Sequence, residues 1–316
     1  MSSSGDKFTL EFERPIRELE GQLQVASNQS EMKKIKEKIL SLEKDIYPNL
    51  TSWERVLLSR HPKRPHAIDY IDNIITDFFE LSGDRYFAND KSIIAGFGYL
   101  SKKKVAVIGI EKGNKTKEKI LRNFGMPRPE GYRKALRIMK LADRFKIPII
   151  TLIDTPGAYP GIGAEERGQS LAIANNLSEM FQLQTPIISL VIGEGGSGGA
   201  LGIGVADRVL MMEYSTYSVI SPESCASILW ADPQKANIAA NSLQLGPQKA
   251  KELDVIDEII LEPIGGAHRN KEKSFIAVKN ALSNNLTEMD GKCHKTLREL
   301  RFKKFRKMGN LTLVRK

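Results

Sequence analysis

The stretch Ile187-Ile-Ser-Leu-Val-Ile-Gly-Glu-Gly-Gly-Ser-Gly-Gly-Ala200 decides how this chain is expected to fold. Its first six residues form an apolar run that predicts a buried strand, and a glycine-rich segment, 193–199, follows at once. After it, an alanine- and glycine-rich run predicts a helix that ends near Ala206. A strand, a glycine-rich turn and a helix in this order are typical of a layered α/β core.

Apolar runs and helical patterns alternate on both sides of this stretch. Strands are expected over 92–99, 104–110, 147–153, 208–213 and 217–220, and helices over 132–144 and 166–182. A short lysine-rich turn joins the first two strands and predicts a β-hairpin. Because several of the later runs are continuously apolar, we expect strands that are buried on both faces of the sheet.

The two ends of the chain have a different pattern. Apolar residues recur at helical spacing over 16–23 and again over 32–46, with a break at Asn28, and predict a helical hairpin. From about Lys271 the pattern is helical again. We therefore expect three parts: a helical hairpin in residues 1–50, an α/β core in 51–270 and a basic helical extension in 271–316.

The composition of the 316 residues is that of an ordinary globular protein, with 41% hydrophobic and 27% charged residues. No apolar run reaches the length of a transmembrane helix, and the first residues do not resemble a secretory signal. Cys225 and Cys293 are the only cysteines, so no disulfide framework is expected and the pattern favours a reducing, intracellular compartment. Two distant cysteines and four histidines also predict no metal site on this chain.

The net charge of +10 is concentrated at the C-terminal end. Residues 295–316 hold nine basic residues and one acid, which gives this tail a net charge of +8. A basic tail is typical of a solvated or partner-binding helix, and this is the favoured interpretation. A non-catalytic scaffold, or a nucleic-acid binder that works through the tail, stays open as an alternative.

The glycine-rich segment fits three different motifs. The first is the dinucleotide fingerprint, since Gly193, Gly195 and Gly198 have its spacing and Glu213 follows about 20 residues later. In that fold, however, the fingerprint normally follows the first strand of the domain, whereas several strands are expected before this one.

The second motif is the nucleophile elbow of serine hydrolases. Gly195, Ser197 and Gly199 have the spacing that the elbow requires, and Asp207 or Asp254 and then His268 follow in the order of a hydrolase triad. A serine between glycines is also ordinary loop composition, so a serine hydrolase that uses Ser197 and His268 stays an alternative.

The third motif uses only the backbone. The first N–H groups of a helix have no intrahelical acceptor and lie at the positive end of the helix dipole. Glycine leaves those N–H groups open to a substrate oxygen, so Gly198 and Gly199 are candidates for an oxyanion site. From composition alone, glycines that serve only close helix-to-strand packing are an equally good explanation.

Several long blocks of the chain resemble the carboxyltransferase alpha subunit of multi-subunit acetyl-CoA carboxylase. The resemblance extends from Phe12 over nearly the whole chain and is weakest at the C-terminal end. The blocks that carry it are 60–65, 115–119, 123–127, 129–135, 153–169, 191–201, 214–230 and 262–270.

The resemblance implies a ClpP/crotonase-type α/β fold, a spiral of ββα units with active sites at a subunit interface. It implies that a carboxyl group moves from carboxybiotin, on the biotin carboxyl carrier protein, to acetyl-CoA, which gives malonyl-CoA in the first committed step of fatty acid synthesis. It also implies an obligate beta subunit in an α2β2 assembly, a biotin carboxylase in the same complex, and a zinc ion on the beta subunit only. The expected compartment is the cytoplasm, or the plastid stroma for a plastid-encoded chain.

The resemblance also implies roles for individual residues. The oxyanion glycines of the family correspond to Gly198 and Gly199, whose N–H groups would hold the ureido oxygen of biotin. A loop beside the biotin pocket would contain Gly157, Ala158, Tyr159, Gly161 and Gly163. Lys112 and Lys115 are candidates for contact with CoA phosphates or the malonyl carboxylate, although a solvated basic loop is the favoured interpretation of both.

Overall fold

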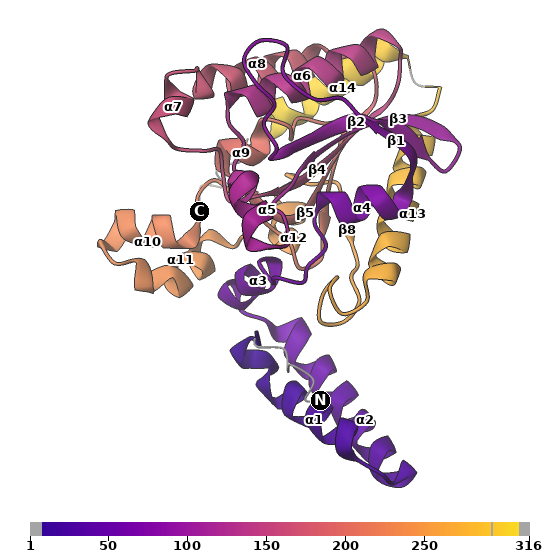
Figure 1. The fold of residues 1–316 in the computed structure, drawn as a ribbon, viewed down its shortest axis with the longest axis vertical. Helices are drawn as coiled ribbons and strands as arrows, with labels where there is room; N and C mark the ends of the chain where they lie inside the picture. The colour runs from indigo at the N-terminus through magenta and orange to yellow at the C-terminus, as the bar shows by residue number, and fades with distance from the viewer. Residues whose placement is uncertain (1–7, 292, 310–316) are drawn as a thin grey trace, which may run out of the picture.

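The computed structural model describes residues 8–291 and 293–309, and its centre is an eight-stranded sheet (Figure 1). The strands run in the order β1-β2-β3-β4-β5-β6-β8, and β7 pairs with β5 beside this row. The strands are β1 (Ile75–Glu80), β2 (Ile93–Leu100), β3 (Lys103–Ile110), β4 (Ile149–Thr155), β5 (Ile187–Gly196), β6 (Arg208–Met212), β7 (Thr216–Ser218) and β8 (Glu258–Ile260).

The predicted hairpin is confirmed, because β2 and β3 pair antiparallel over their whole length. From β3 onward all pairings are parallel. Every residue of β4 is buried, as expected for a strand covered on both faces. Parallel strands end at the same edge of the sheet, so the segments that follow β4 and β5 lie next to each other.

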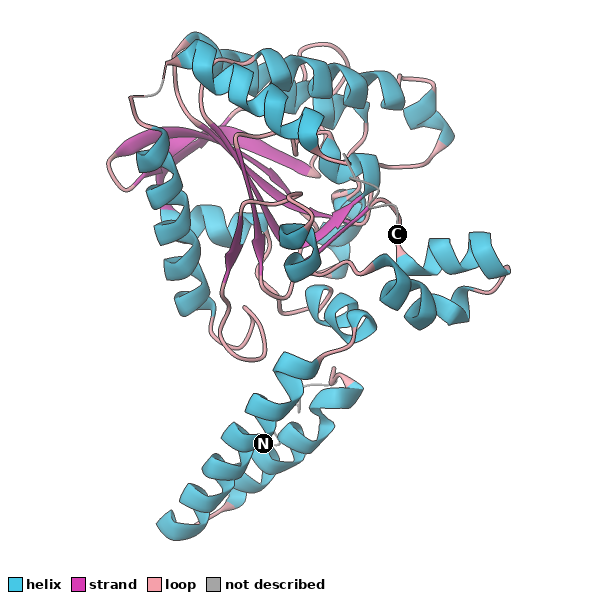
Figure 2. Cartoon of the chain, turned by 180° about the vertical axis from the view of Figure 1, so that it is seen from behind, coloured by secondary structure: helices cyan, strands magenta, loops and turns pink. Residues whose placement is uncertain are grey.

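Helices cover both faces of the sheet (Figures 1 and 2). On one face, α6 (Pro129–Arg144), α8 (Gln169–Gln182) and α9 (Ser197–Leu201) share a buried apolar cluster with the strands. On the other, α4 (Ala67–Ile74) and α13 (Lys271–Met289) form a second cluster. The shorter helices are α5 (Thr116–Leu121), α7 (Ile162–Glu165), α10 (Pro222–Trp230), α11 (Ala236–Leu243) and α12 (Pro247–Glu252), and the 3-10 turns are η1 (Glu11–Glu13), η2 (Tyr47–Asn49), η3 (Asn123–Gly125) and η4 (Pro233–Lys235). Of the helices in the described part of the chain, none combines the length and apolarity needed to cross a lipid bilayer.

The N-terminal helices α1 (Arg14–Val25) and α2 (Gln29–Ile46) form a hairpin that projects from the body of the molecule (Figure 1). The Asn28 side chain accepts a hydrogen bond from Ser30 N–H and so begins α2 at the break in the sequence pattern. A small apolar cluster around Tyr47, near α3 (Ser52–Ser59), joins the hairpin to the body. The helical hairpin is therefore confirmed, while the domain boundaries at 50 and 270 stay predictions.

Two predicted helices have different bounds in the structure. The helix expected up to Ala206 ends at Leu201 as α9, and the strand before it continues past Ile192 to Gly196, because its last three residues pair with β7. The helix expected over 166–182 begins at Gln169, since Gly168 before it has a left-handed φ of 79° that interrupts the helical pattern. Neither strand pairing nor backbone handedness at a glycine can be read from hydrophobic periodicity.

The basic C-terminal segment is less solvated than its composition predicts. The helix α14 (His294–Lys307) inserts Arg301, 1% exposed, where its guanidinium donates to the carbonyl oxygens of Met180, Leu183 and Thr185. The same group forms an ion pair of 2.7 Å with Asp207. Lys304 pairs with Asp257 in a half-buried position, so part of the tail's charge is paired within the fold, whereas Lys307 pairs with Asp254 at the surface. The end of the tail, 310–316, lies outside the described residues.

We predict that Arg301→Met lowers the free energy of unfolding by about 3–5 kcal/mol, because it leaves the Asp207 carboxylate and three carbonyl oxygens unpaired in the interior. Urea unfolding near neutral pH measures this loss. Lys307→Met is the matched control, since it removes an exposed ion pair from the same helix and should change the midpoint far less. Equal losses in the two variants would contradict the buried role of Arg301.

Candidate active site

The segments that follow β4 and β5 touch backbone to backbone. Thr155 at the end of β4 pairs with Gly195 in β5. A Cβ atom on Gly196 would lie closer than 3.0 Å to the carbonyl oxygen of Pro156, and one on Gly199 would lie equally close to the backbone of Gly157. Glycine at positions 196 and 199 is therefore required by the packing of the chain itself.

Gly198 is under no such constraint. The nearest atom to a Cβ placed there would be Cδ1 of Ile173, at 3.8 Å, which is ordinary contact. Gly198 is half-buried, whereas Gly199 is buried. The first turn of α9 supplies no intrahelical acceptor for the N–H groups of either residue. A donor without a side chain thus borders a pocket lined by Ser197, Gly198, Leu201, Tyr217, Ser218, Val219 and Val255.

The loop after β4 is held rigidly against this turn. The Thr155 hydroxyl accepts from Gly157 N–H and donates to the Gly157 carbonyl oxygen. The Gln169 side-chain amide donates to the carbonyl oxygens of Tyr159 and Pro127, both at 2.9 Å. The predicted loop residues Gly157 and Ala158 lie directly against Gly199.

The other predicted loop residues lie farther along the same loop. The Tyr159 ring is stacked under the guanidinium of Arg128, 4.6 Å from the ring centroid, and lies against Gly161. Gly163 lies beside the Arg167 side chain. The structure therefore brings only the first two of the five predicted residues into contact with the glycine turn.

Lys112 was expected in a solvated loop, and this is wrong. Its ammonium group lies 2.7 Å from Asp154 Oδ1 and 2.6 Å from Glu194 Oε2, with only 15% of the side chain exposed. Lys115 is exposed and lies just before α5, where its N–H donates to Glu118. The two lysines are thus in different environments.

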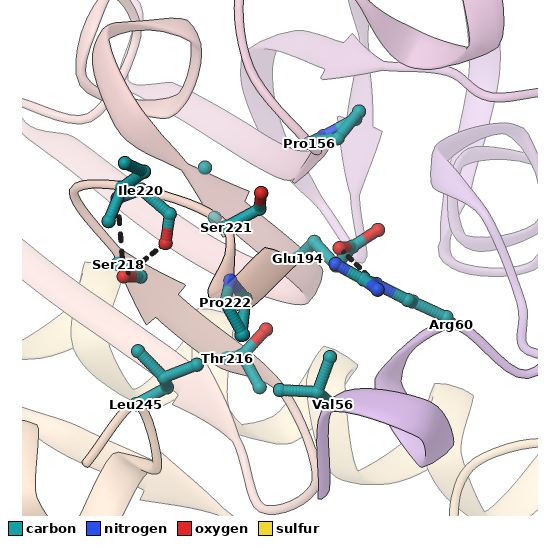
Figure 3. Close-up of a pocket in the computed structure, with 12 residues that line it drawn as sticks. Val56, Arg60, Pro156, Glu194, Thr216, Ser218, Ile220, Ser221, Pro222 and Leu245 are labelled. Atoms are coloured by element: carbon teal, nitrogen blue, oxygen red, sulfur yellow. Dashed lines mark hydrogen bonds and ion pairs between the residues drawn. The ribbon is translucent and has the colours of Figure 1, made fainter. Parts of the chain in front are cut away.

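Two further groups complete the surroundings of Lys112. Arg60 Nε lies 2.7 Å from Glu194 Oε1 (Figure 3), whereas Lys112 binds the other carboxylate oxygen, Oε2. His66 Nδ1 lies 2.9 Å from Asp154 Oδ2. The sequence analysis did not predict a role for Arg60, His66, Asp154 or Glu194. The sequence feature that could have indicated one is that Asp154 and Glu194 are charged residues at the ends of apolar runs.

These carboxylates are ionised despite their burial. Burial alone would raise the pKa of Asp154, but Lys112 and His66 outweigh it and hold that pKa well below its usual range. Burial also acts to raise the pKa of Glu194, and Lys112 and Arg60 lower it instead. The same carboxylates raise the pKa of Lys112 against the effect of its burial. Asp154, Glu194 and Lys112 are therefore all charged at neutral pH.

The serine hydrolase alternative is wrong in its triad. Ser197 is exposed and has a left-handed φ of 52°, as a nucleophile elbow would. However, the His268 ring is stacked on His61 with centroids 3.7 Å apart, and within the described residues neither of its nitrogens has a hydrogen-bond partner. Asp207 pairs with Arg301 and Asp254 with Lys307, so neither candidate acid orients the histidine.

The dinucleotide alternative fails for a different reason. The fingerprint needs its glycines in a turn between a strand and a helix. Here Gly193 and Gly195 belong to β5, and Gly195 pairs with Tyr217 on β7.

Within residues 8–291 and 293–309, no three His, Cys, Asp or Glu side chains gather into a group that could hold a metal ion.

Comparison with known proteins identifies the family. A family model described as "Acetyl co-enzyme A carboxylase carboxyltransferase-like" matches residues 9–309. The chain belongs to this family. Two similar relatives are acetyl-coenzyme A carboxylase carboxyl transferase alpha subunits. That of Methylococcus capsulatus is 56% identical over 289 residues, which is 89% of this chain and 90% of the relative. That of Photorhabdus laumondii is 53% identical and covers 95% of this chain and 97% of the relative.

Solved structures of other carboxyltransferases share the crotonase-type fold. A transcarboxylase 12S structure aligns with a TM-score of 0.54 at 18% identity, over 71% of this chain and 44% of that one. The Pseudomonas malonate decarboxylase MdcD-MdcE heterodimer aligns with a TM-score of 0.53 at 16% identity, over 68% of this chain and 91% of that one. The fold predicted for the carboxyltransferase alpha family is thus confirmed.

The His268 ring gives a prediction for the pH dependence of stability. Burial, with the nearby positive charges of His61, Arg64 and Arg269, lowers the pKa of His268 from 6.5 to about 2. The unfolded chain therefore takes up a proton below about pH 6.5 that the folded chain does not, and stability falls as the pH falls. We expect His268→Gln to remove up to about 1.4 kcal/mol of this loss per pH unit below that point.

The measurement is the free energy of unfolding in urea at several pH values between about 7.5 and 5. The comparison uses the slope with pH, so a constant loss of stability in the variant does not affect it. Parallel curves for wild type and His268→Gln would show that His268 does not cause the pH dependence.

Proposed function

We propose that this chain supplies the biotin side of the active site of an acetyl-CoA carboxylase carboxyltransferase. The overall reaction would move a carboxyl group from carboxybiotin, carried by a biotin carboxyl carrier protein, to acetyl-CoA and so form malonyl-CoA. The names of the relatives support the reaction, since both are carboxyl transferase alpha subunits. The single observation that carries the site is Gly198, whose missing Cβ serves no packing need of this chain.

In this proposal the first turn of α9 acts through its backbone. The N–H groups of Gly198 and Gly199 donate to the ureido oxygen of biotin, where negative charge grows as the carboxyl group leaves. The positive end of the helix dipole adds to this stabilisation. Loss of one such donor typically costs about 2.7–4 kcal/mol in the transition state. Bound carboxybiotin supplies the activated carboxyl group.

The pocket beside Gly198 suits the ureido ring of biotin, which is partly apolar and has one oxygen to be bound. Leu201, Tyr217, Val219 and Val255 line the pocket beside Gly198 and can displace water from the bound group. Gly157 and Ala158 support Gly199 from behind. We assign Tyr159, Gly161 and Gly163 to the outer wall of the same site.

A second subunit is required in this proposal. The pocket opens at the surface around Ser197, and the oxyanion of the acetyl-CoA thioester needs donors from elsewhere. We propose a beta-type subunit that supplies them and carries the zinc ion, in an α2β2 assembly with biotin carboxylase as a further component. Lys115, which is exposed, is a candidate contact for CoA phosphates. Lys112 is already bound by two carboxylates, so we assign it to the framework of the site. The compartment we propose is the cytoplasm or the plastid stroma.

The direct test is to co-purify the full chain with a candidate beta subunit and to measure decarboxylation of malonyl-CoA in the presence of free biotin. We expect biotin-dependent activity of the complex and none of either subunit alone. Esterase activity of the isolated chain that Ser197→Ala abolishes would overturn the proposal in favour of a hydrolase.

The two glycines should respond differently to substitution. We predict that Gly198→Ala leaves the fold intact but lowers kcat of the complex by at least about 100-fold, because the methyl group blocks the approach to the N–H donors. Gly199→Ala should lower the melting temperature instead, because its Cβ collides with the backbone of Gly157. Thermal unfolding and kcat of both variants are compared with wild type. Wild-type kcat in Gly198→Ala would disprove the oxyanion assignment.

A further inference from the structure

A cluster of charged and titratable side chains surrounds Asp154 and Glu194, just before the glycine turn, and we call it the strand-end cluster. Its members come from six separate segments that meet at the carboxyl ends of β3, β4 and β5. They are Arg60, His66, Lys112, Asp154, Glu194 and Glu223. Arg60 binds Glu194 (Figure 3) and also pairs with Glu223, which lies in the first turn of α10.

The charges of the strand-end cluster are satisfied internally. Three carboxylates meet two permanent cations, and His66 donates or accepts at Asp154 as the third nitrogen partner. Lys112 and Arg60 are therefore already paired, although both border a pocket of about 240 Å³. Because carboxylates outnumber the two cations and already bind both, the cluster is unsuited to bind an anion and acts on the protein itself.

Glu194 is held through both its side chain and its backbone. Lys112 and Arg60 bind its carboxylate from opposite sides at 2.6 and 2.7 Å. Its own N–H donates to Asp154 Oδ1 at 3.0 Å. The side chain of Glu194 is only 11% exposed, and that of Asp154 only 2%. Removal of one charge from such a buried group strains every remaining partner.

Only Gly195, Gly196 and Ser197 separate Glu194 from Gly198. Two glycines give this connection a large conformational freedom in the absence of other constraints. The pairing of Gly195 with Thr155, and of residues 194–196 with β7, fixes its strand part, and Glu194 is the charged residue that anchors it to Lys112 and Arg60. The orientation of the Gly198 N–H therefore depends on where Glu194 is held.

We propose that Glu194 is a positioning residue, which through Arg60 and Lys112 sets the direction of the N–H groups that bind the biotin oxygen. This inference rests on the proposed function. Catalysis of this kind is sensitive to small displacements, and an error of about 1 Å can cost about 100-fold in rate. Glu194 itself touches no reacting atom in this scheme.

The test uses Glu194→Gln in the complex with the beta subunit. Glutamine keeps the shape of the side chain but removes the charge that Lys112 and Arg60 require. We expect kcat to fall by about 10- to 100-fold with the KM for malonyl-CoA within about twofold of wild type. Lys112→Met should have a similar effect, and the double variant should lose little more than either single one, because the residues act through one cluster.

Asp207→Asn is the matched control. Asp207, which lies just before β6, also forms a buried ion pair, but it contacts the amino end of β5, where it accepts from Ile187 N–H. Asp207→Asn should lower the melting temperature about as much as Glu194→Gln while kcat stays within about twofold of wild type. A loss of kcat in the control equal to that in Glu194→Gln would show a general effect of stability and overturn the proposal.

A second readout separates this inference from the proposed function. Amide hydrogen exchange of the segment 195–201 should be faster in Glu194→Gln than in wild type and unchanged in Asp207→Asn. If the wild-type complex is inactive but amide exchange is faster in Glu194→Gln, the proposed reaction is disproved while the anchoring role of Glu194 is supported. Unchanged exchange, or wild-type kcat in Glu194→Gln, would overturn the positioning role.

Discussion

The structure of the site depends on the contact between two backbones, that of the loop after β4 and that of the glycine-rich end of β5. At Gly196 and Gly199 any side chain would enter the space of Pro156 or Gly157. Because no Cβ intervenes, the loop can support the first turn of α9 directly and the N–H donors acquire a fixed environment. Gly198 differs from these two glycines, because a Cβ atom there would meet no backbone and only the Ile173 side chain at 3.8 Å.

The close backbone contact fixes the distance between the loop after β4 and the end of β5, but it does not fix the direction in which the chain leaves β5. Buried ion pairs supply this second constraint. β5 carries an ionic network at each end: Asp207 with Arg301 at its start, and Glu194 with Lys112 and Arg60 at its finish. Buried ion pairs are weak sources of net stability, but a broken pair is costly, so they define position more than they add stability. A strand held in this way resists sliding against its neighbours, so the position of the glycine turn that follows it is fixed as well.

The order of strands and helices could be predicted from the sequence because it follows from local periodicity, as in the β2–β3 hairpin and the arm formed by α1 and α2. What failed depends on contacts between distant segments. β5 extends through Gly196 because β7 pairs with it, and Lys112 is buried because Asp154 and Glu194 arrive from two other strands. In the sequence, Arg301 looks like the other basic residues of the tail. Only its contacts in the fold, with Asp207 and three carbonyl oxygens, distinguish it. For the site, the resemblance to the carboxyltransferase family indicated the glycines, but composition could not separate Gly198 from Gly199.

The conformation of Ser197 shows why backbone geometry alone does not assign a function. A left-handed residue between a strand and a short helix is compatible with a reactive serine and with an anion site at the following N–H groups. The partners decide between them. The candidate histidine, His268, is stacked on His61, while the turn lies against the backbone of Pro156, Gly157 and Ala158 and against the Ile173 side chain. A site built this way contains no side chain that must change protonation, because the acids of the strand-end cluster stay ionised and peptide N–H groups do not titrate. Its selectivity for an oxygen that gains negative charge then comes from position alone, which is the property that the glycine contacts and the buried ion pairs together provide.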